Sequence, residues 1–402
     1  MTRHNGEIKN LGVMACALLA IALFLSPFAA HAALTWNDSI PSIEAENNQT
    51  IEIEISGTIS GNLSVPDGAT VTIIGEAKTT ADGITLNIGN DATVVWKANL
   101  SGTSHPLISL SNAGTFEVAG GKISSPVSTA ISSLETATVK INGGTVEGGD
   151  RAIFIESGSV EVSEGTVKAL AENGKAIHTT AGNIKVSGGI VQTTAMGGRG
   201  IYTTSGNIEI SGGKIQATGK NGMAIQQKST DTKTVTRIII SGTDTKISIE
   251  GSKGMAIQAT NATIIVYDNV SVAGLENYSN VIFSASWEGT ASGAEIMATY
   301  GGVQIQTGAR VANNKELQIT VNGTGGGKDD EYTYVWTDTN SVLDNGNTLT
   351  IESLGDTVNV LCTVTGIDKT KPVVSSVTPS GTDEEISGTV AIAFNEIMST
   401  EG

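Results

Sequence analysis

The sequence predicts an all-β protein in which a parallel β-solenoid is followed by the strands of a β-sandwich. Three observations support this fold class. One short motif recurs between Ile51 and Ala273, its apolar residues alternate with a period of two, and after Asn313 short strands follow one another between Gly and Asn turns. Only 4% of residues are aromatic and 49 are glycine, which suits a narrow core of small apolar side chains.

The repeat has a period of 22 to 25 residues, measured between the isoleucines that start each copy. A period of this size is typical of solenoids, which stack one coil per repeat. Only the last step is longer, because the insertion KSTDTKTVTR adds a predicted loop. The repeat therefore predicts about nine coils. The starting isoleucines are Ile59, Ile84, Ile108, Ile131, Ile153, Ile177, Ile201, Ile225 and Ile257.

Most copies contain a triplet in which two apolar residues flank a charged one, such as Val139-Lys140-Ile141. In a strand the flanking pair points inward and the middle residue points outward. A Gly-Gly pair such as Gly143-Gly144 follows most triplets, because a sharp corner requires a positive φ or a close backbone approach. One or two residues, such as Val146, then turn inward again. This pattern predicts three short strands per coil, the arrangement of a parallel β-helix.

The segment ISGTISGNLSVPDGATVTIIG and the Gly-Gly repeats resemble the right-handed β-helix proteins of the pectate-lyase-like superfamily, over residues Ile51 to Ala273. The resemblance implies a right-handed coil, as does the right-handed preference of parallel crossover connections. Enzymes of that superfamily act on acidic polysaccharides with clustered carboxylates. In this chain the aspartates of the repeat are scattered, so we expect no catalytic residue, no cofactor and no metal site. They are Asp67, Asp82, Asp91, Asp150, Asp231, Asp244 and Asp268.

The outward residues of successive triplets alternate in charge over five coils. Stacking would place each of them beside an opposite charge, so we interpret the series as a device that fixes the register of the coils. A slip by one coil would bring like charges together. The series is Glu117, Lys140, Glu161, Lys185 and Glu209.

A second outward series carries the candidate ligand-binding residues. Three successive coils each place a ring one residue after the starting isoleucine and a cation two residues before it. Rings can stack on sugar faces, and cations can pair with uronate or sulfate groups. The alternative interpretation is structural: like residues often stack in β-helices, and the cations could face acidic neighbours such as Glu172. The candidates are Arg151, Phe154, Lys175, His178, Arg199 and Tyr202.

Residues beyond the repeat predict further β domains. We expect residues 33–273 to form the β-helix and 274–311 a cap and connector, with Trp287 closing the open end of the stack. Residues 312–367 read as a β-sandwich, and Trp336 with Cys362 resembles the core Trp and second cysteine of an immunoglobulin-like (Ig-like) domain.

The partner cysteine of that domain is missing, so no internal disulfide is expected and Cys362 is predicted to be a small buried residue. The positions at which the partner would stand are Leu317, Ile319 and Val321. Residues 368–402 resemble the incomplete start of a second Ig-like module, of the type found in bacterial surface-layer proteins.

Residues 1–32 predict a signal peptide. Arg3 and Lys9 precede an apolar run, and Ala30-His31-Ala32 provides a cleavage pattern near Ala32. We therefore expect a bacterial protein that is secreted or held at the cell surface, without a transmembrane span in the mature chain. The net charge of −17 disfavours nucleic acids and anionic lipids as partners.

Three functions are compatible with this organisation. The first is a non-catalytic adhesin whose β-helix binds a polysaccharide or a host or cell-surface glycoprotein. In this case the Ig-like modules form a stalk that carries the β-helix. The second is a polysaccharide lyase or hydrolase of the β-helix class. The third is a structural surface-layer or spacer protein. The lack of clustered carboxylates favours the first over the second.

Overall fold

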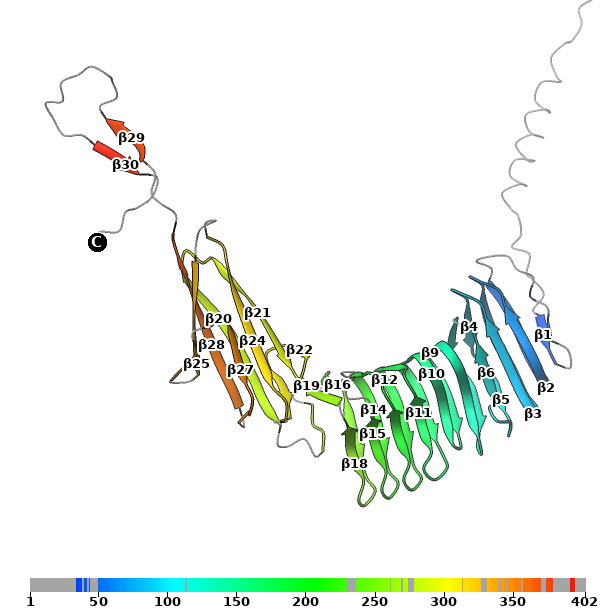
Figure 1. The fold of residues 1–402 in the computed structure, drawn as a ribbon. Helices are drawn as coiled ribbons and strands as arrows, with labels where there is room; N and C mark the ends of the chain where they lie inside the picture. The colour runs from blue at the N-terminus through cyan, green and yellow to red at the C-terminus, as the bar shows by residue number, and fades with distance from the viewer. Residues whose placement is uncertain are drawn as a thin grey trace, which may run out of the picture.

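The computed structural model is all-β, and no helix occurs in the part of the chain that it describes (Figure 1). In particular, it contains no helix long and apolar enough to cross a membrane. The predicted signal peptide, residues 1–32, lies outside the described part. The described residues are 34–37, 40, 41, 43, 50–112, 114–229, 236–260, 262–268, 270–273, 278–312, 314–326, 331–338, 341–344, 346–355, 357–369, 374–378 and 391–394.

The first nineteen strands form a β-solenoid of about nine coils, consistent with a parallel β-helix. Every pairing between two of these strands is parallel, and the coils follow one another as a continuous stack (Figure 1). The strands are β1 (Leu34–Trp36), β2 (Thr50–Val65), β3 (Thr70–Ile88), β4 (Thr93–Trp96), β5 (Asn99–Ser101), β6 (Ile108–Ser111), β7 (Thr115–Val118), β8 (Lys122–Ser125), β9 (Thr129–Gly148), β10 (Arg151–Ala169), β11 (Lys175–Thr179), β12 (Asn183–Thr193), β13 (Arg199–Thr203), β14 (Ile208–Ala217), β15 (Met223–Lys228), β16 (Thr236–Ile240), β17 (Lys246–Ile249), β18 (Met255–Thr260) and β19 (Ala262–Val266).

Three columns of apolar side chains fill the solenoid, as the alternating pattern predicts. The starting isoleucines from Ile84 to Ile257 pair in one unbroken register from coil to coil. The prediction that Ile59 starts this column is wrong. Ile59 pairs with Thr79, and Gly61 lies opposite Ile84. The coil that holds Thr79 has extra residues before Ile84, so equal spacing along the chain does not give equal positions in the first coil.

The charged series of the triplets stacks in the predicted order. Lys140 pairs in register with Glu117 on one side and with Glu161 on the other, and Lys185 pairs with Glu161 and Glu209. Two contacts are ion pairs: Nζ of Lys140 lies 3.8 Å from Oε2 of Glu161, and Nζ of Lys185 lies 3.8 Å from Oε1 of Glu209. These side chains are largely exposed, so each pair stabilises the register by only about 0.2–1 kcal/mol.

The far end of the solenoid continues into the next domain through hydrogen-bonded strands. Ile265 on β19 pairs antiparallel with Val311 on β23 (Ala309–Val311), and β23 pairs with the start of β20 (Ser279–Gly289). Trp287 does not close the stack, contrary to the prediction: it lies on β20 opposite Val364 and is 51% exposed. Val270, Val272 and Tyr278 pack against the solenoid core instead.

Two sheets follow the solenoid and share one hydrophobic core. Trp336 and Cys362 lie opposite each other on neighbouring strands and are fully buried, as are the three predicted partner positions on β24. One sheet contains β23, β20, β28, β25 and β26, and the other has the order β22-β21-β24-β27. Their further strands are β21 (Gly293–Tyr300), β22 (Val303–Ile305), β24 (Leu317–Thr324), β25 (Glu331–Asp338), β26 (Ser341–Asp344), β27 (Thr348–Ile351) and β28 (Thr357–Ile367).

The segment expected to be a cap and connector, residues 274–311, supplies β20 to β23 of these sheets. Strand β20 runs parallel to β28 from the pair Asn280 and Thr357 to the pair Gly289 and Gly366. Further along the chain, β29 (Val374–Thr378) and β30 (Ala391–Phe394) pair antiparallel with each other in a sheet of their own.

Candidate functional site

The six predicted ligand-binding residues meet on one face of the solenoid, at the starts of β10, β11 and β13. The three cations are register partners in successive coils, and the three rings are register partners three residues further along. Because neighbouring strands lie about 4.8 Å apart, the side chains form two adjacent columns. We call this array the ring–cation ladder. It consists of Arg151, Lys175, Arg199, Phe154, His178 and Tyr202.

The backbone of each coil presents the ladder outward. Ile153, Ile177 and Ile201 are buried in the core, so the residue that follows each of them points to the outer surface. The loops before β11 and β15 turn at asparagines with positive φ, 57° at Asn173 and 57° at Asn221. Asparagine tolerates this left-handed conformation. Each loop can therefore turn tightly and start the next strand in register with the strand of the coil before it.

The three rings are in direct contact along the stack. The ring centroids of Phe154 and His178 lie 4.9 Å apart at an interplanar angle of 49°. Those of His178 and Tyr202 lie 4.8 Å apart at 77°, an edge-to-face arrangement. Aromatic pairs favour tilted contacts of this kind over a flat sandwich. The rings are half-buried, so a row of ring edges and faces remains open to solvent across three coils.

The cations flank this row without being fully neutralised. The guanidinium of Arg151 lies 5.0 Å from the Phe154 centroid, and Nζ of Lys175 lies 5.6 Å from the Tyr202 centroid. Arg151 also pairs with the partly exposed Asp150 at 3.4 Å. None of the three cations forms an ion pair with Glu172, the acidic neighbour that the structural interpretation invoked, within the described residues.

Arg199 is held by hydrogen bonds rather than by a carboxylate. Its Nε donates to Oε1 of Gln226 at 2.5 Å, and its Nη1 donates to the carbonyl of Gly197 at 2.9 Å. Gln226 in turn donates to Oε1 of Gln258, one coil further along. The two glutamines therefore continue the ring column and fix the guanidinium beside Tyr202.

The crowding of cations changes the protonation of the ladder. Burial, together with the nearby charges of Arg151 and Lys175, lowers the pKa of His178 to about 3, so the imidazole is neutral at pH 7. Burial also lowers the pKa of Lys175, and the charges of Arg151 and Arg199 act in the same direction, while Asp150 opposes them. An anion bound beside Lys175 would relieve this unfavourable environment.

A cavity of about 430 Å³ opens at the end of the ladder, where the ring column stops. Arg151 and Phe154 form one wall, and the loop at His105 and Pro106 forms another. Glu135 also lines the cavity, but its Oε2 accepts a hydrogen bond from the backbone N–H of Asn112. The sequence did not indicate this cavity, because the loop at His105 and Pro106 lies two coils before Arg151.

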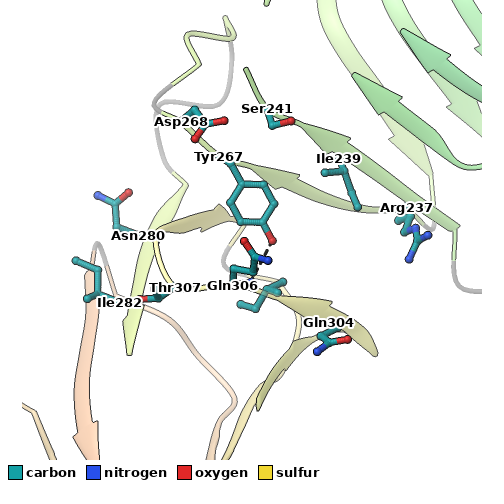
Figure 2. Close-up of a pocket in the computed structure, with 12 residues that line it drawn as sticks. Arg237, Ile239, Ser241, Tyr267, Asp268, Asn280, Ile282, Gln304, Gln306 and Thr307 are labelled. Atoms are coloured by element: carbon teal, nitrogen blue, oxygen red, sulfur yellow. Dashed lines mark hydrogen bonds between the residues drawn. The ribbon is translucent and has the colours of Figure 1, made fainter. Parts of the chain in front are cut away.

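A larger cavity, of about 870 Å³, lies where the solenoid meets the sandwich, and the sequence did not predict it (Figure 2). Its lining comes from β16 and Ser241 after it, the two residues after β19, the start of β20, β22 and the turn between β22 and β23. Tyr267 stands among the lining residues, and its hydroxyl accepts a hydrogen bond from the backbone N–H of Gln306 at 3.2 Å. The residues that line this cavity share no common spacing in the sequence, so the repeat pattern did not indicate them.

Asp150 is the only carboxylate that forms an ion pair with a ladder cation in the described part of the chain, so the ladder itself offers no pair of carboxylates around a single bond. In the same part of the chain, no group of three or more His, Cys, Asp or Glu side chains could hold a metal ion. Comparisons of the chain with protein families, with curated proteins and with solved structures find no match.

Proposed function

We propose that this chain is an exported bacterial surface protein that binds acidic polysaccharide or glycoprotein glycans without catalysis. The ring–cation ladder is the binding face, and the observation that carries the proposal is the position of Lys175. This lysine lies between two arginines and is opposed only by Asp150, in an environment that lowers its pKa. A uronate or sulfate group would supply the missing negative charge, while the rings contact sugar faces.

The remaining features of the proposal concern export and presentation. The signal peptide is removed near Ala32, the solenoid is a right-handed β-helix, and the sandwich with Trp336 and Cys362 is an Ig-like module of a stalk. Strand β23 pairs with both β19 of the solenoid and β20 of the sandwich. This pairing supports a role for the sandwich in holding the binding face away from the cell, because the two parts are joined by strands rather than by a loop alone.

A glycan array that includes uronate and sulfated polysaccharides tests the proposal. The wild-type protein should bind acidic glycans, and the triple variant R151Q/K175Q/R199Q should bind them at least about tenfold more weakly. The matched control is K78Q/K97Q/K246Q, which removes the same formal charge from exposed lysines outside the ladder that form no ion pair within the described residues. This control should bind within about twofold of wild type.

The rings are tested separately, because they contribute contact rather than charge. The variant F154A/H178A/Y202A should also lose acidic-glycan binding while its circular dichroism spectrum stays that of a β protein. Binding that survives both triple variants would remove the ladder as the site.

Two further outcomes would favour the other functions. Release of unsaturated products or reducing ends from pectic polysaccharides in the presence of Ca²⁺ would favour a lyase or hydrolase. Failure of every glycan and host-protein screen with a folded protein would favour a structural spacer.

A further inference from the structure

The cavity between the solenoid and the sandwich, named here the junction cavity, is the largest of the cavities described above. Its volume of about 870 Å³ lies within the range of ordinary ligand sites, and such sites often occur between domains. Arg237 and Ser241 on or beside β16 line one side, while Asn280, Gln304 and Gln306 line the other. Figure 2 shows these side chains around the ring of Tyr267.

The walls of the junction cavity are fixed to one another. Strand β23 bridges β19 and β20, and the Tyr267 hydroxyl accepts the backbone N–H of Gln306 across the cavity. On the solenoid side, the carboxylate of Asp268 accepts the N–H of Gly242 at 2.8 Å. On the sandwich side, Thr307 accepts the N–H of Phe283 at 3.0 Å. The cavity is therefore preformed, which reduces the entropy lost when a ligand binds.

Several polar side chains in the cavity have no partner within the described part of the chain. The carboxamides of Asn280, Gln304 and Gln306 form no hydrogen bond there, and the guanidinium of Arg237 forms no ion pair. All four are exposed residues, so their polar groups are accessible to solvent and to a ligand. Each carboxamide can donate and accept hydrogen bonds at the same time.

We propose that the junction cavity binds a neutral saccharide, as a second site distinct from the ring–cation ladder. Carboxamides match sugar hydroxyls because both kinds of group donate and accept, and the Tyr267 ring offers a surface for a sugar face. An anionic ligand fits less well, because the single cation Arg237 shares the cavity with Asp268. An apolar ligand fits less well because the lining is dominated by amides, hydroxyls and charged groups.

An array of neutral oligosaccharides of hexoses and N-acetylhexosamines, followed by titration calorimetry on the hits, tests this site. Wild-type protein should bind at least one neutral oligosaccharide. The double variant Q304A/Q306A should weaken that binding by about tenfold or more, because it removes two of the free carboxamides. Both residues are exposed, so the melting temperature should stay unchanged.

The matched control is N62A/N99A, which removes two exposed carboxamides from the solenoid and should leave neutral-saccharide binding unchanged. The ladder variant R151Q/K175Q/R199Q should also retain it, so a failure of the acidic-glycan proposal is distinguishable from a failure of this one. The inference is overturned if wild type binds no neutral oligosaccharide, or if Q304A/Q306A binds it as wild type does.

Discussion

The imidazole of His178 meets the ring of Tyr202 edge to face, with centroids 4.8 Å apart, and it contacts Phe154 on its other side. Nδ1 of His178 is buried and has no hydrogen-bond partner within the described residues. A protonated imidazole in this position would lack a counter-charge and would face Arg151 and Lys175. The stack therefore favours the neutral form of His178, so protonation of this residue should oppose folding.

We expect the solenoid to lose stability as the pH falls from about 6.5 toward 3. The pKa of His178 is about 3 in the folded chain against an ordinary value of 6.5, so the unfolded chain binds a proton in this window and the folded chain does not. Stability is full above pH 6.5 and decreases below it. After allowance for the partial exposure of the ring, the loss is about 1–2 kcal/mol.

The variant H178Q isolates this contribution, because glutamine does not titrate. Urea unfolding at pH 7 and at pH 4 should show a smaller loss of stability on acidification in H178Q than in wild type. Equal losses in the two proteins would contradict a depressed pKa at His178.

Reversing one charge of the triplet series should weaken the stack. Glu161 lies between Lys140 and Lys185 in neighbouring coils, so E161K places three cations in a row. We expect a loss of about 0.5–1.5 kcal/mol in the free energy of unfolding, which shrinks as salt screens the repulsion. The measurement is thermal or urea unfolding at low and high ionic strength.

The control for this reversal is E54K, which makes the same change of charge at an exposed position. Its register neighbours are Thr35 and Ile74, so no like charge lies opposite it. If E54K and E161K lose the same stability with the same salt dependence, the alternating series does not set the register.

Cys362 should be unreactive in the folded protein. Its side chain is fully buried opposite Trp336, and burial raises the pKa of the thiol to about 11. The thiolate is the reactive form, and little of it exists at pH 8. In protein that starts at Ala33, in which Cys362 is the only cysteine, Ellman's reagent should therefore label Cys362 only after denaturant is added. Rapid labelling without denaturant would show that the core between the two sheets opens readily.

Much of the solenoid was predictable because one rule, the alternation of inward and outward residues, repeats in every coil. The columns from Ile84 to Ile257 and the pairs around Lys140 follow directly from it. Ile59 was misplaced because the rule assumes coils of equal length, and the second coil is longer. The position of Trp287 was mispredicted because an isolated Trp after a repeat does not reveal which strand it belongs to.

The ladder could be predicted from the sequence in part, and the junction cavity could not. The ladder repeats with the coils, so its columns were predictable, while the neutral state of His178 and the bond from Arg199 to Gln226 depend on packing. The junction cavity joins Arg237, Tyr267 and Gln306, which have no common spacing. The pairing of β23 with β19 and β20 brings them together, and the sequence pattern did not indicate that pairing.

Alanine substitutions at two glycines with nearly the same φ should distinguish the cost of backbone strain from the cost of steric crowding. Gly57 has φ +65° and open space where a Cβ would stand, whereas Gly144 has φ +64° and would place a Cβ 2.6 Å from the carbonyl oxygen of Gly120. We expect Gly57→Ala to cost about 1 kcal/mol from the left-handed conformation alone. Gly144→Ala should cost about 2–4 kcal/mol, because the neighbouring coil must also move. Urea unfolding of both variants measures the difference, and equal costs would show that coil spacing at the Gly-Gly corners does not depend on the missing side chain.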